Sequence, residues 1–213
     1  MSFSKMVKDE YCSLNWEDLC CIQSEMMACL LCSGKFRQGQ ISISTANESF
    51  AKRIETMISE LYATQTEIKR GREIYTVMVT DKIAYGQIIA DLSEQAGFDA
   101  IRGTVVTNVF TRECCRKSFL RGLFLAGGSI SEPNKSYHME ISTRRQSVAK
   151  TALNILEMEE INANIIKKSG YYLIYLKESQ QISDFLLITG AHNAMLEFES
   201  LRVNKSVRNT VNR

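Results

Sequence analysis

The chain has 213 residues, of which 45% are hydrophobic and 23% are charged, and its formal net charge at pH 7 is +2. This length supports one domain or two small ones with a substantial core, while so small a net charge excludes attraction to nucleic acid through the overall field, so any basic surface must be local. Seven cysteines, an odd number with two adjacent pairs, exclude a disulfide-stapled secreted scaffold and indicate a reducing compartment.

Membrane, metal and cofactor sites are not predicted. The sequence has no apolar run long enough to cross a bilayer and no signal-peptide segment, so we expect a cytoplasmic protein, associated with the nucleoid where it binds DNA. Cys29 and Cys32 have the spacing of a metal or redox pair, but both fall inside a predicted helix without a matching ligand pair. Core-filling thiols are the favoured interpretation.

The first half begins with two helices. Ser4 is expected to cap a short helix from Lys5 to Ser13, and an apolar helix follows from Trp16 to Ser33. Gly34 then ends the second helix, in the left-handed conformation that glycine adopts without a Cβ clash.

Strands and two further helices complete the first half. Period-two alternation predicts a strand from Gln38 to Ser44 with Ile41 and Ile43 inward, and a capping box at Thr45 opens the next helix. The remaining predicted elements are a helix from about Glu48 to Tyr62, a hairpin of Gln65 to Arg70 with Glu73 to Val79 turned at Gly71, and a last helix capped by Asp81.

The second half repeats the first. At an offset of 94 residues the matching pairs are Cys20/Cys114, Cys21/Cys115, Ser24/Ser118, Leu31/Leu125 and Gly34/Gly128. At an offset of 98 they are Ile43/Ile141, Ser44/Ser142, Thr45/Thr143 and, in the hairpin, Ile68-Lys69-Arg70 with Ile166-Lys167-Lys168. Ser179 is then expected to cap the last helix. Because the offset rises from 94 to 98, the second half has four extra residues between its first helix and its first predicted strand. They are assigned to the loop at Glu132-Pro133-Asn134.

These elements predict an α/β (α+β) fold in which the unit α-β-α-β-β-α occurs twice about a pseudo-two-fold axis. The expected divisions are a first repeat with an N-terminal helix (1–97), a linking strand (98–111), a second repeat (112–200) and a basic linker (201–213). A glycine-rich phosphate loop does not occur in the sequence, which excludes a Rossmann array.

Small residues recur four apart in the two apolar helices, as Ala28 and Cys32 in the first and as Gly122 and Ala126 in the second. Nothing larger than a methyl or thiol group then separates the backbones. We expect the two helices to pack closely along this seam.

At these helices the sequence resembles the LAGLIDADG homing endonucleases. The corresponding nonapeptides are MMACLLCSG, from Met26 to Gly34, and LRGLFLAGG, from Leu120 to Gly128. The resemblance implies paired central helices and a DNA-binding scaffold. In that family the eighth position is an acid that binds the catalytic metal, whereas Ser33 and Gly127 stand here.

Serine and glycine do not supply the metal ligands that phosphodiester cleavage of this type needs, so we expect a protein that is not an enzyme. The rival hypothesis is a surviving metal-dependent endonuclease that uses Glu132 or Glu140. Glu132 is expected to be a solvated loop carboxylate.

Two longer segments, Phe119 to Ile141 and Met195 to Arg213, resemble the WhiA family of bacterial regulators of sporulation and cell division. The resemblance implies a degenerate LAGLIDADG-like domain that precedes a helix-turn-helix, which would follow Arg213. It further implies transcription regulation, double-stranded DNA as the main partner and another regulator protein as a further one. The alternative is a pure protein-interaction module.

Two sets of residues are candidates for DNA contact. The acid-free basic segment near the end of the chain contains Arg202, Lys205, Arg208 and Arg213. The predicted sheet face offers Gln40, Ser42, Lys69 and Lys167, opposed by Glu67 and Glu140. Because this face is nearly neutral, the basic segment is expected to supply most of the affinity.

Overall fold

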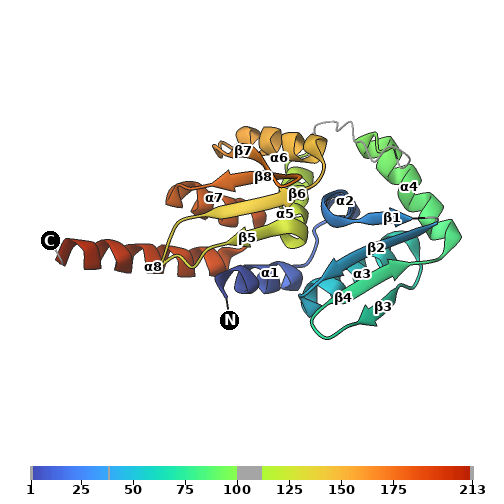
Figure 1. Cartoon of the computed structure of the whole chain (residues 1–213), viewed down its shortest axis with the longest axis horizontal. Coiled ribbons are helices and arrows are strands. Elements are labelled where there is room, and N and C mark those ends of the chain that lie inside the picture. The colour runs from blue at the N-terminus through green and yellow to red at the C-terminus, as the bar shows by residue number, and fades with distance from the viewer. Residues whose placement is uncertain (1, 38, 100–111, 212–213) are drawn as a thin grey trace.

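The computed structural model describes residues 2–37, 39–99 and 112–211, without the side chains of 206 and 208–211. Two similar halves lie side by side with helices α2 and α5 between their sheets (Figure 1). The first half consists of α2 (Leu19–Ser33), β1 (Lys35–Arg37), β2 (Gln40–Thr45), α3 (Glu48–Tyr62), β3 (Glu67–Arg70), β4 (Tyr75–Val79) and α4 (Lys82–Ala96). The second consists of α5 (Glu113–Gly127), β5 (Gly128–Ile130), β6 (Met139–Thr143), α6 (Gln146–Met158), β7 (Asn164–Lys168), β8 (Tyr171–Leu176) and α7 (Ser179–Thr189).

Two more helices flank the second half, α1 (Phe3–Ser13) and α8 (His192–Val211). Among the described residues, no helix is both long enough and apolar enough to span a membrane. The strand predicted between Ala100 and Thr111 lies outside the described residues.

The two sheets have the same topology, with strand orders β1-β2-β4-β3 and β5-β6-β8-β7, and every neighbouring pair is antiparallel. The predicted duplication is confirmed. Each half also contains one strand that was not predicted, β1 or β5. These strands have three residues each, too few for alternation to be detected.

The four extra residues of the second half lie in the β5–β6 loop, as predicted. In the first half the chain turns tightly from β1 to β2, and Gly39 has a positive φ of 81°. In the second half residues 131–138 connect the two strands, and Lys135 N–H donates to Glu132 C=O at 2.9 Å. This loop holds the only proline of the chain, Pro133.

The seam between α2 and α5 depends on Gly122. A Cβ atom at this position would clash with the Glu25 carbonyl oxygen and lie 2.8 Å from the Ala28 Cβ. The Cys29 thiol donates to Gly122 C=O at 3.4 Å, and Cys32 is buried beside Ser142 C=O, also at 3.4 Å. The small residues therefore permit direct backbone contact, while Ala126 lies half-buried at the edge.

Gly34 and Gly128 do not end their helices in the left-handed conformation that was predicted. Their φ values are −64° and −84°, and both continue directly into strands. Glycine is required for another reason, since a Cβ at Gly34 would clash with Leu30 C=O, and at Gly128 with the ring and carbonyl of Phe124.

Two of the predicted capping residues lie two positions from the observed ones, although α3 begins at Glu48 as predicted. Ser2 rather than Ser4 caps α1, since its Oγ accepts from Lys5 N–H. Asn47 rather than Thr45 caps α3, by accepting from Phe50 N–H at 2.9 Å. Asp81 caps α4 as predicted.

Two further helix starts were wrong. Helix α7 begins at Ser179 itself, so the cap position belongs to Glu178. Helix α2 begins at Leu19 rather than Trp16, because the Trp16 indole N–H donates to the buried Glu25 carboxylate at 3.0 Å.

A buried ion cluster joins three elements around Glu25, which is fully buried in α2. Arg53 from α3 and Arg121 from α5 both donate to its carboxylate, Arg121 Nε at 2.7 Å. The Arg53 guanidinium also lies 3.9 Å above the Trp16 ring. The cluster connects the two halves and is asymmetric, since Phe119 occupies the position equivalent to Glu25.

Most of the predicted basic linker (201–213) lies in helix α8. Residues up to Val211 continue α8 without a break. The start of α8 is capped from α1, since Glu10 accepts from the backbone N–H groups of Asn193 and Ala194, each at 2.8 Å.

Candidate nucleic-acid interface

Each sheet has one buried face and one open face. In the first sheet Ile41 and Ile43 point into the core, so the residues that alternate with them, Gln40, Ser42 and Ser44, lie on the open face. Gln40 and Ser44 are exposed and Ser42 is half-buried. The open face is the surface on which DNA contact was predicted.

Three cations lie on the open face of the first sheet. Lys35 and Arg37 of β1 pair with Ser42 and Gln40, and partners in an antiparallel ladder share a face. Lys69 of β3 lies on the same face and is exposed, 3.6 Å from Glu67. Three cations therefore oppose one carboxylate.

The register of the second hairpin contradicts the predicted position of Lys167. In the first sheet Ile68 pairs with Val77, but in the second Ile165, not Ile166, pairs with Ile174. The hairpins thus correspond at an offset of 97, and a slip of one residue reverses the face of each side chain. Lys167 lies on the helix-facing side, 5.6 Å from the Tyr172 ring, at the exposed edge.

The open face of the second sheet also holds three cations. Lys168 lies on it opposite Tyr171, and Arg144 donates to the Tyr171 hydroxyl at 2.9 Å. Lys177 follows β8, with its Nζ 5.0 Å from the Tyr175 ring. The acid on this face is Glu140, whose carboxylate lies 3.2 Å from His138 Nε2. The expectation of a nearly neutral sheet face was therefore wrong.

Sequence reasoning missed five of these six cations, namely Lys35, Arg37, Arg144, Lys168 and Lys177. The first two lie on a strand too short to predict, and the hairpin register was assigned one residue off. Arg144 and Lys177 lie just beyond strand ends, where alternation gives no information.

The candidate basic segment is less available than its composition indicates. Arg202 donates to Gln180 at 3.1 Å and to Glu199 at 3.2 Å. Lys205 donates to Lys135 C=O at 3.2 Å and lies 4.5 Å from the Tyr137 ring. The side chains of Arg208 and Arg213 lie outside the described part of the chain.

The eighth positions of the two nonapeptides, where the homing endonucleases have the metal-binding acid, hold Ser33 and Gly127 here. Ser33 donates back to Cys29 C=O of its own helix at 3.3 Å. At Gly127 a Cβ would clash with Ser142 C=O and lie 2.8 Å from Cys32 Sγ, so any larger residue is excluded by the packing. The two halves therefore lie too close together at Gly127 to admit an acidic side chain.

A cation, rather than an acid, lies near the end of the α2–α5 seam that contains Ser33 and Gly127. Arg145, at the start of α6, donates to Leu31 C=O at 2.7 Å and so caps the C-terminal end of α2 from the other half. Its guanidinium lies 5.7 Å from the Phe36 ring and 5.8 Å from that of Phe98. Burial lowers the pKa of Arg145. A positive charge here disfavours a divalent cation.

The two acids of the rival nuclease hypothesis have other partners. Glu132 accepts from Phe3 N–H at 2.8 Å and thereby caps α1, so it is not the solvated carboxylate that was expected. Glu140 pairs with His138. Across the described residues, the one group of three His, Cys, Asp or Glu side chains close enough to share an ion is Cys20, Cys21 and Cys114.

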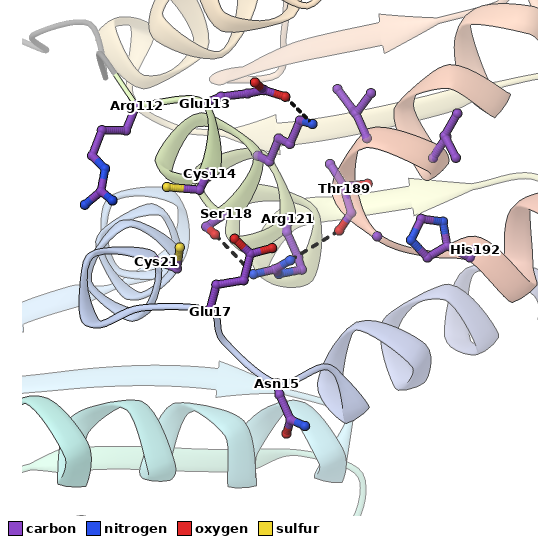
Figure 2. Close-up of a pocket in the computed structure, with 14 residues that line it drawn as sticks. Asn15, Glu17, Cys21, Arg112, Glu113, Cys114, Ser118, Arg121, Thr189 and His192 are labelled. Carbon is purple, nitrogen blue, oxygen red and sulfur yellow. Dashed lines mark hydrogen bonds and ion pairs between the residues drawn. The ribbon is translucent and has the colours of Figure 1, made fainter.

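A cavity of about 600 Å³ lies at the opposite end of the central helices, between α5 and the α7–α8 junction (Figure 2). The three arginine and lysine side chains that line it are paired: Arg112 with Asp18 at 3.4 Å, Lys117 with Glu113 at 2.5 Å and Arg121 with Glu25 at 2.7 Å. Each of these three cations already has a carboxylate partner, which does not favour an anion site.

Comparison with known protein families gives two matches that together cover most of the chain. Residues 19–93 match the WhiA N-terminal LAGLIDADG-like domain, and residues 116–208 match the WhiA LAGLIDADG-like domain. The "probable cell division protein WhiA" of Ruminiclostridium cellulolyticum is 38% identical over 224 aligned residues, which cover 100% of this chain and 71% of that protein. The protein of the same description from Desulforamulus reducens is 34% identical, with 100% and 70% covered.

Solved structures give the same fold. Full-length DUF199/WhiA from Thermatoga maritima superposes with a TM-score of 0.77 at 20% identity, covering 100% of this chain and 71% of that one. The homing endonuclease I-DmoI in complex with DNA and Mn has a TM-score of 0.59 at 16% identity, covering 81% and 98%. At these identities the likeness concerns the fold, which is that of the LAGLIDADG homing endonucleases.

Proposed function

The chain belongs to the WhiA family, and from this premise we propose that it is a catalytically inactive DNA-binding domain that serves transcription regulation in cell division and sporulation. The observation that carries the proposal is the charge on the open faces of the two sheets. On each face three cations outnumber one acid. The scaffold is shared with I-DmoI, a protein solved in complex with DNA.

The open faces fit the phosphate backbone of a duplex. Lys35, Arg37, Lys69 and Lys168 are exposed on strands, where the sheet fixes their spacing. Lysine and arginine that neutralise phosphates release counterions, which gives affinity without sequence preference. Gln40 and Ser42 stand between these cations and carry groups that bond base edges.

This arrangement favours the sheets over the basic segment as the main source of affinity. Arg202 and Lys205 must first leave partners within the chain before they contact phosphate. For Lys35 and Arg37 the structure records no carboxylate partner, so these side chains can contact phosphate without first leaving one. The division of labour expected from composition is therefore reversed in this proposal.

The test compares two variants that each lose four positive charges. The sheet variant carries Lys35→Gln, Arg37→Gln, Lys168→Gln and Lys177→Gln, and the segment variant carries Arg202→Gln, Lys205→Gln, Arg208→Gln and Arg213→Gln. Binding to a duplex is measured by fluorescence anisotropy at several salt concentrations. Each lost phosphate contact lowers the slope of log K against log [salt] by about 0.9.

We expect the sheet variant to lose up to about 3.6 slope units and the segment variant clearly less. A larger loss in the segment variant would return the main role to α8. If the affinity of the wild type for the duplex does not depend on salt, phosphate contacts do not supply it, which contradicts the proposal. If the wild type does not bind the duplex even at low salt, DNA binding by this domain is contradicted.

The inactive state is part of the proposal. It is supported by Ser33 and Gly127 at the former ligand positions and by Arg145 beside them. A supercoiled plasmid incubated with the protein and Mg²⁺ is expected to stay intact. Mg²⁺-dependent cleavage that Glu140→Gln abolishes would restore the nuclease hypothesis.

A protein-interaction role remains the second candidate because of α8. Leu196 and Val207 are 63% and 54% exposed, and their spacing puts them on one face of the helix. If the wild type does not bind DNA at low salt, this face is the next surface to test. Leu196→Gln with Val207→Gln would then remove partner binding without change in the fold.

A further inference from the structure

The duplication brings four cysteines together where α2 and α5 begin. Cys20 and Cys21 stand in the first turn of α2, and Cys114 and Cys115 stand at the equivalent positions of α5. The Sγ atoms of Cys20, Cys21 and Cys114 all lie within 4.8 Å of one another. Cys115 Sγ lies 4.0 Å from Cys114 Sγ. All four are free thiols.

We propose that Cys20, Cys21 and Cys114 bind one thiophilic d¹⁰ cation, with Zn²⁺ as the probe, and so join the two halves of the domain. Thiolate sulfur is the preferred ligand of such ions. The metal was not predicted because the two cysteine pairs stand 94 residues apart and neither has metal-ligand spacing by itself.

The sulfur positions suit a zinc centre after a small contraction. Zn–S bonds of about 2.3 Å in a tetrahedron place the sulfurs about 3.8 Å apart, so each pair must approach by roughly 1 Å at most. Cys20 and Cys114 are half-buried in the first turns of their helices, so neither thiol is enclosed on all sides. The fourth ligand is water from the adjacent cavity or, after a rotamer change, Cys115.

The surroundings match a three-thiolate centre in charge and access. Three thiolates and a divalent cation carry one net negative charge, and Arg112, which also pairs with Asp18 at 3.4 Å, donates to Cys20 Sγ at 3.1 Å and so places a positive charge beside the centre. Cys21 and Cys114 line the cavity of about 600 Å³, which gives an entry path from solvent (Figure 2). Each thiol releases its proton to the buffer on binding, so affinity rises with pH.

This centre is separate from the former catalytic position. That position lies at the other end of α2, which has 15 residues. At 1.5 Å per residue, about 20 Å separates Cys20 from Ser33. The cation would therefore hold the two helices together and leave the open sheet faces free.

The test begins with protein that has been stripped of metal by a chelator and kept reduced. Titration with Co²⁺ is expected to give a thiolate-to-cobalt charge-transfer band that saturates at one ion per chain and disappears when Zn²⁺ is added. Cys20→Ser and Cys114→Ser should each remove the band. The matched control Cys12→Ser should retain it, because Cys12 lies on α1, outside the cluster.

A second measurement does not depend on the variants. Zn²⁺ should protect Cys20 and Cys114 of the wild type from alkylation and leave the rate at Cys12 unchanged, as measured by mass spectrometry. Absence of the cobalt band in the wild type would overturn the proposal. Equal loss of the band in Cys12→Ser, or equal alkylation with and without Zn²⁺, would overturn it as well.

Discussion

At the scale of single residues, Glu25 is the most constrained charge in the molecule. Its carboxylate is fully buried and accepts from Arg53, Arg121 and Trp16, which belong to three different segments. Two arginines around one carboxylate leave the cluster with one excess positive charge. Removing the carboxylate would leave both guanidinium groups uncompensated in the interior.

Glu25→Gln is therefore expected to destabilise the protein by about 3–5 kcal/mol. The free energy of unfolding from urea titration measures the loss. Glu94→Gln, on the exposed surface of α4, makes the same chemical change and should cost no more than about 0.5 kcal/mol. Equal stability of the two variants would show that the cluster contributes little.

The buried thiol of Cys12 makes the free energy of unfolding decrease as pH rises in the alkaline range. Burial raises its pKa from 9.0 to about 12. Because the folded pKa lies above the unfolded one, the folded state retains the proton between pH 9 and 12 while the unfolded state loses it, and stability falls as pH rises.

Cys12→Ala should accordingly make this alkaline loss of stability shallower. Urea unfolding at pH 7 and pH 10 measures the difference for each protein. Ser13→Ala changes the next residue of α1 without removing a titrating group and should keep the wild-type difference. An unchanged difference in Cys12→Ala would mean that the thiol titrates normally in the fold.

At the scale of elements, the two apolar helices and the glycines that end them could be located from the sequence, because an apolar run followed by glycine is a local signal. The existence and order of α2, α3, β3, β4 and α4 and of their equivalents were correct. The short strands β1 and β5 could not be predicted, since three residues have no period. The face of Lys167 was wrong because the likeness of Ile166-Lys167-Lys168 to Ile68-Lys69-Arg70 concealed a one-residue slip.

The contact of α2 with α5 predicts a large difference between two glycine substitutions. Gly122→Ala should destabilise, since its Cβ meets the Glu25 carbonyl and the Ala28 methyl, and Gly122→Leu should cost about 1–3 kcal/mol or more by overpacking. Gly86→Ala in α4 meets nothing within 4 Å and should be neutral or stabilising by up to about 1 kcal/mol.

Thermal unfolding of the three variants measures this difference. A melting temperature of Gly122→Leu equal to that of the wild type would contradict the seam. A clear loss in Gly86→Ala would show that the helix-propensity argument does not apply in α4.

At the scale of the whole molecule, the pseudo-two-fold relation explains the sheets and the central helices but not the flanking ones. Helix α1 contacts both halves and α8, and its bonds reach far along the chain. Sequence reasoning had no access to these contacts, because charged residues such as Glu10 and Glu132 carry no local sign of a distant helix end. The open-face charges were hidden for other reasons, namely the shortness of β1 and the one-residue slip in the second hairpin.

The cap on α1 gives a test of this docking. Glu132→Ala should destabilise the start of α1 by about 1–3 kcal/mol, the usual cost of losing a hydrogen bond to a charged group, and increase hydrogen exchange in residues 3–13. Asn134→Ala, in the same loop and exposed, should leave that exchange unchanged. Identical exchange in both variants would show that Glu132 does not hold the helix.

The docking of α1 also determines when it can complete its fold during translation. The residues that bond Phe3, Tyr11 and Glu10 follow them by 129, 178 and 183 positions. At about 5–20 residues per second the ribosome needs on the order of 10–40 s to deliver the last of them. During that interval α1 can contact α3, but the surface that α7, α8 and the rest of the second half supply to its apolar face, including the partner of Tyr11, is missing. A nascent chain halted before α7 should therefore bind, through α1, a chaperone that recognises hydrophobic surfaces. Once the chain is synthesised through the end of α8, that association should end.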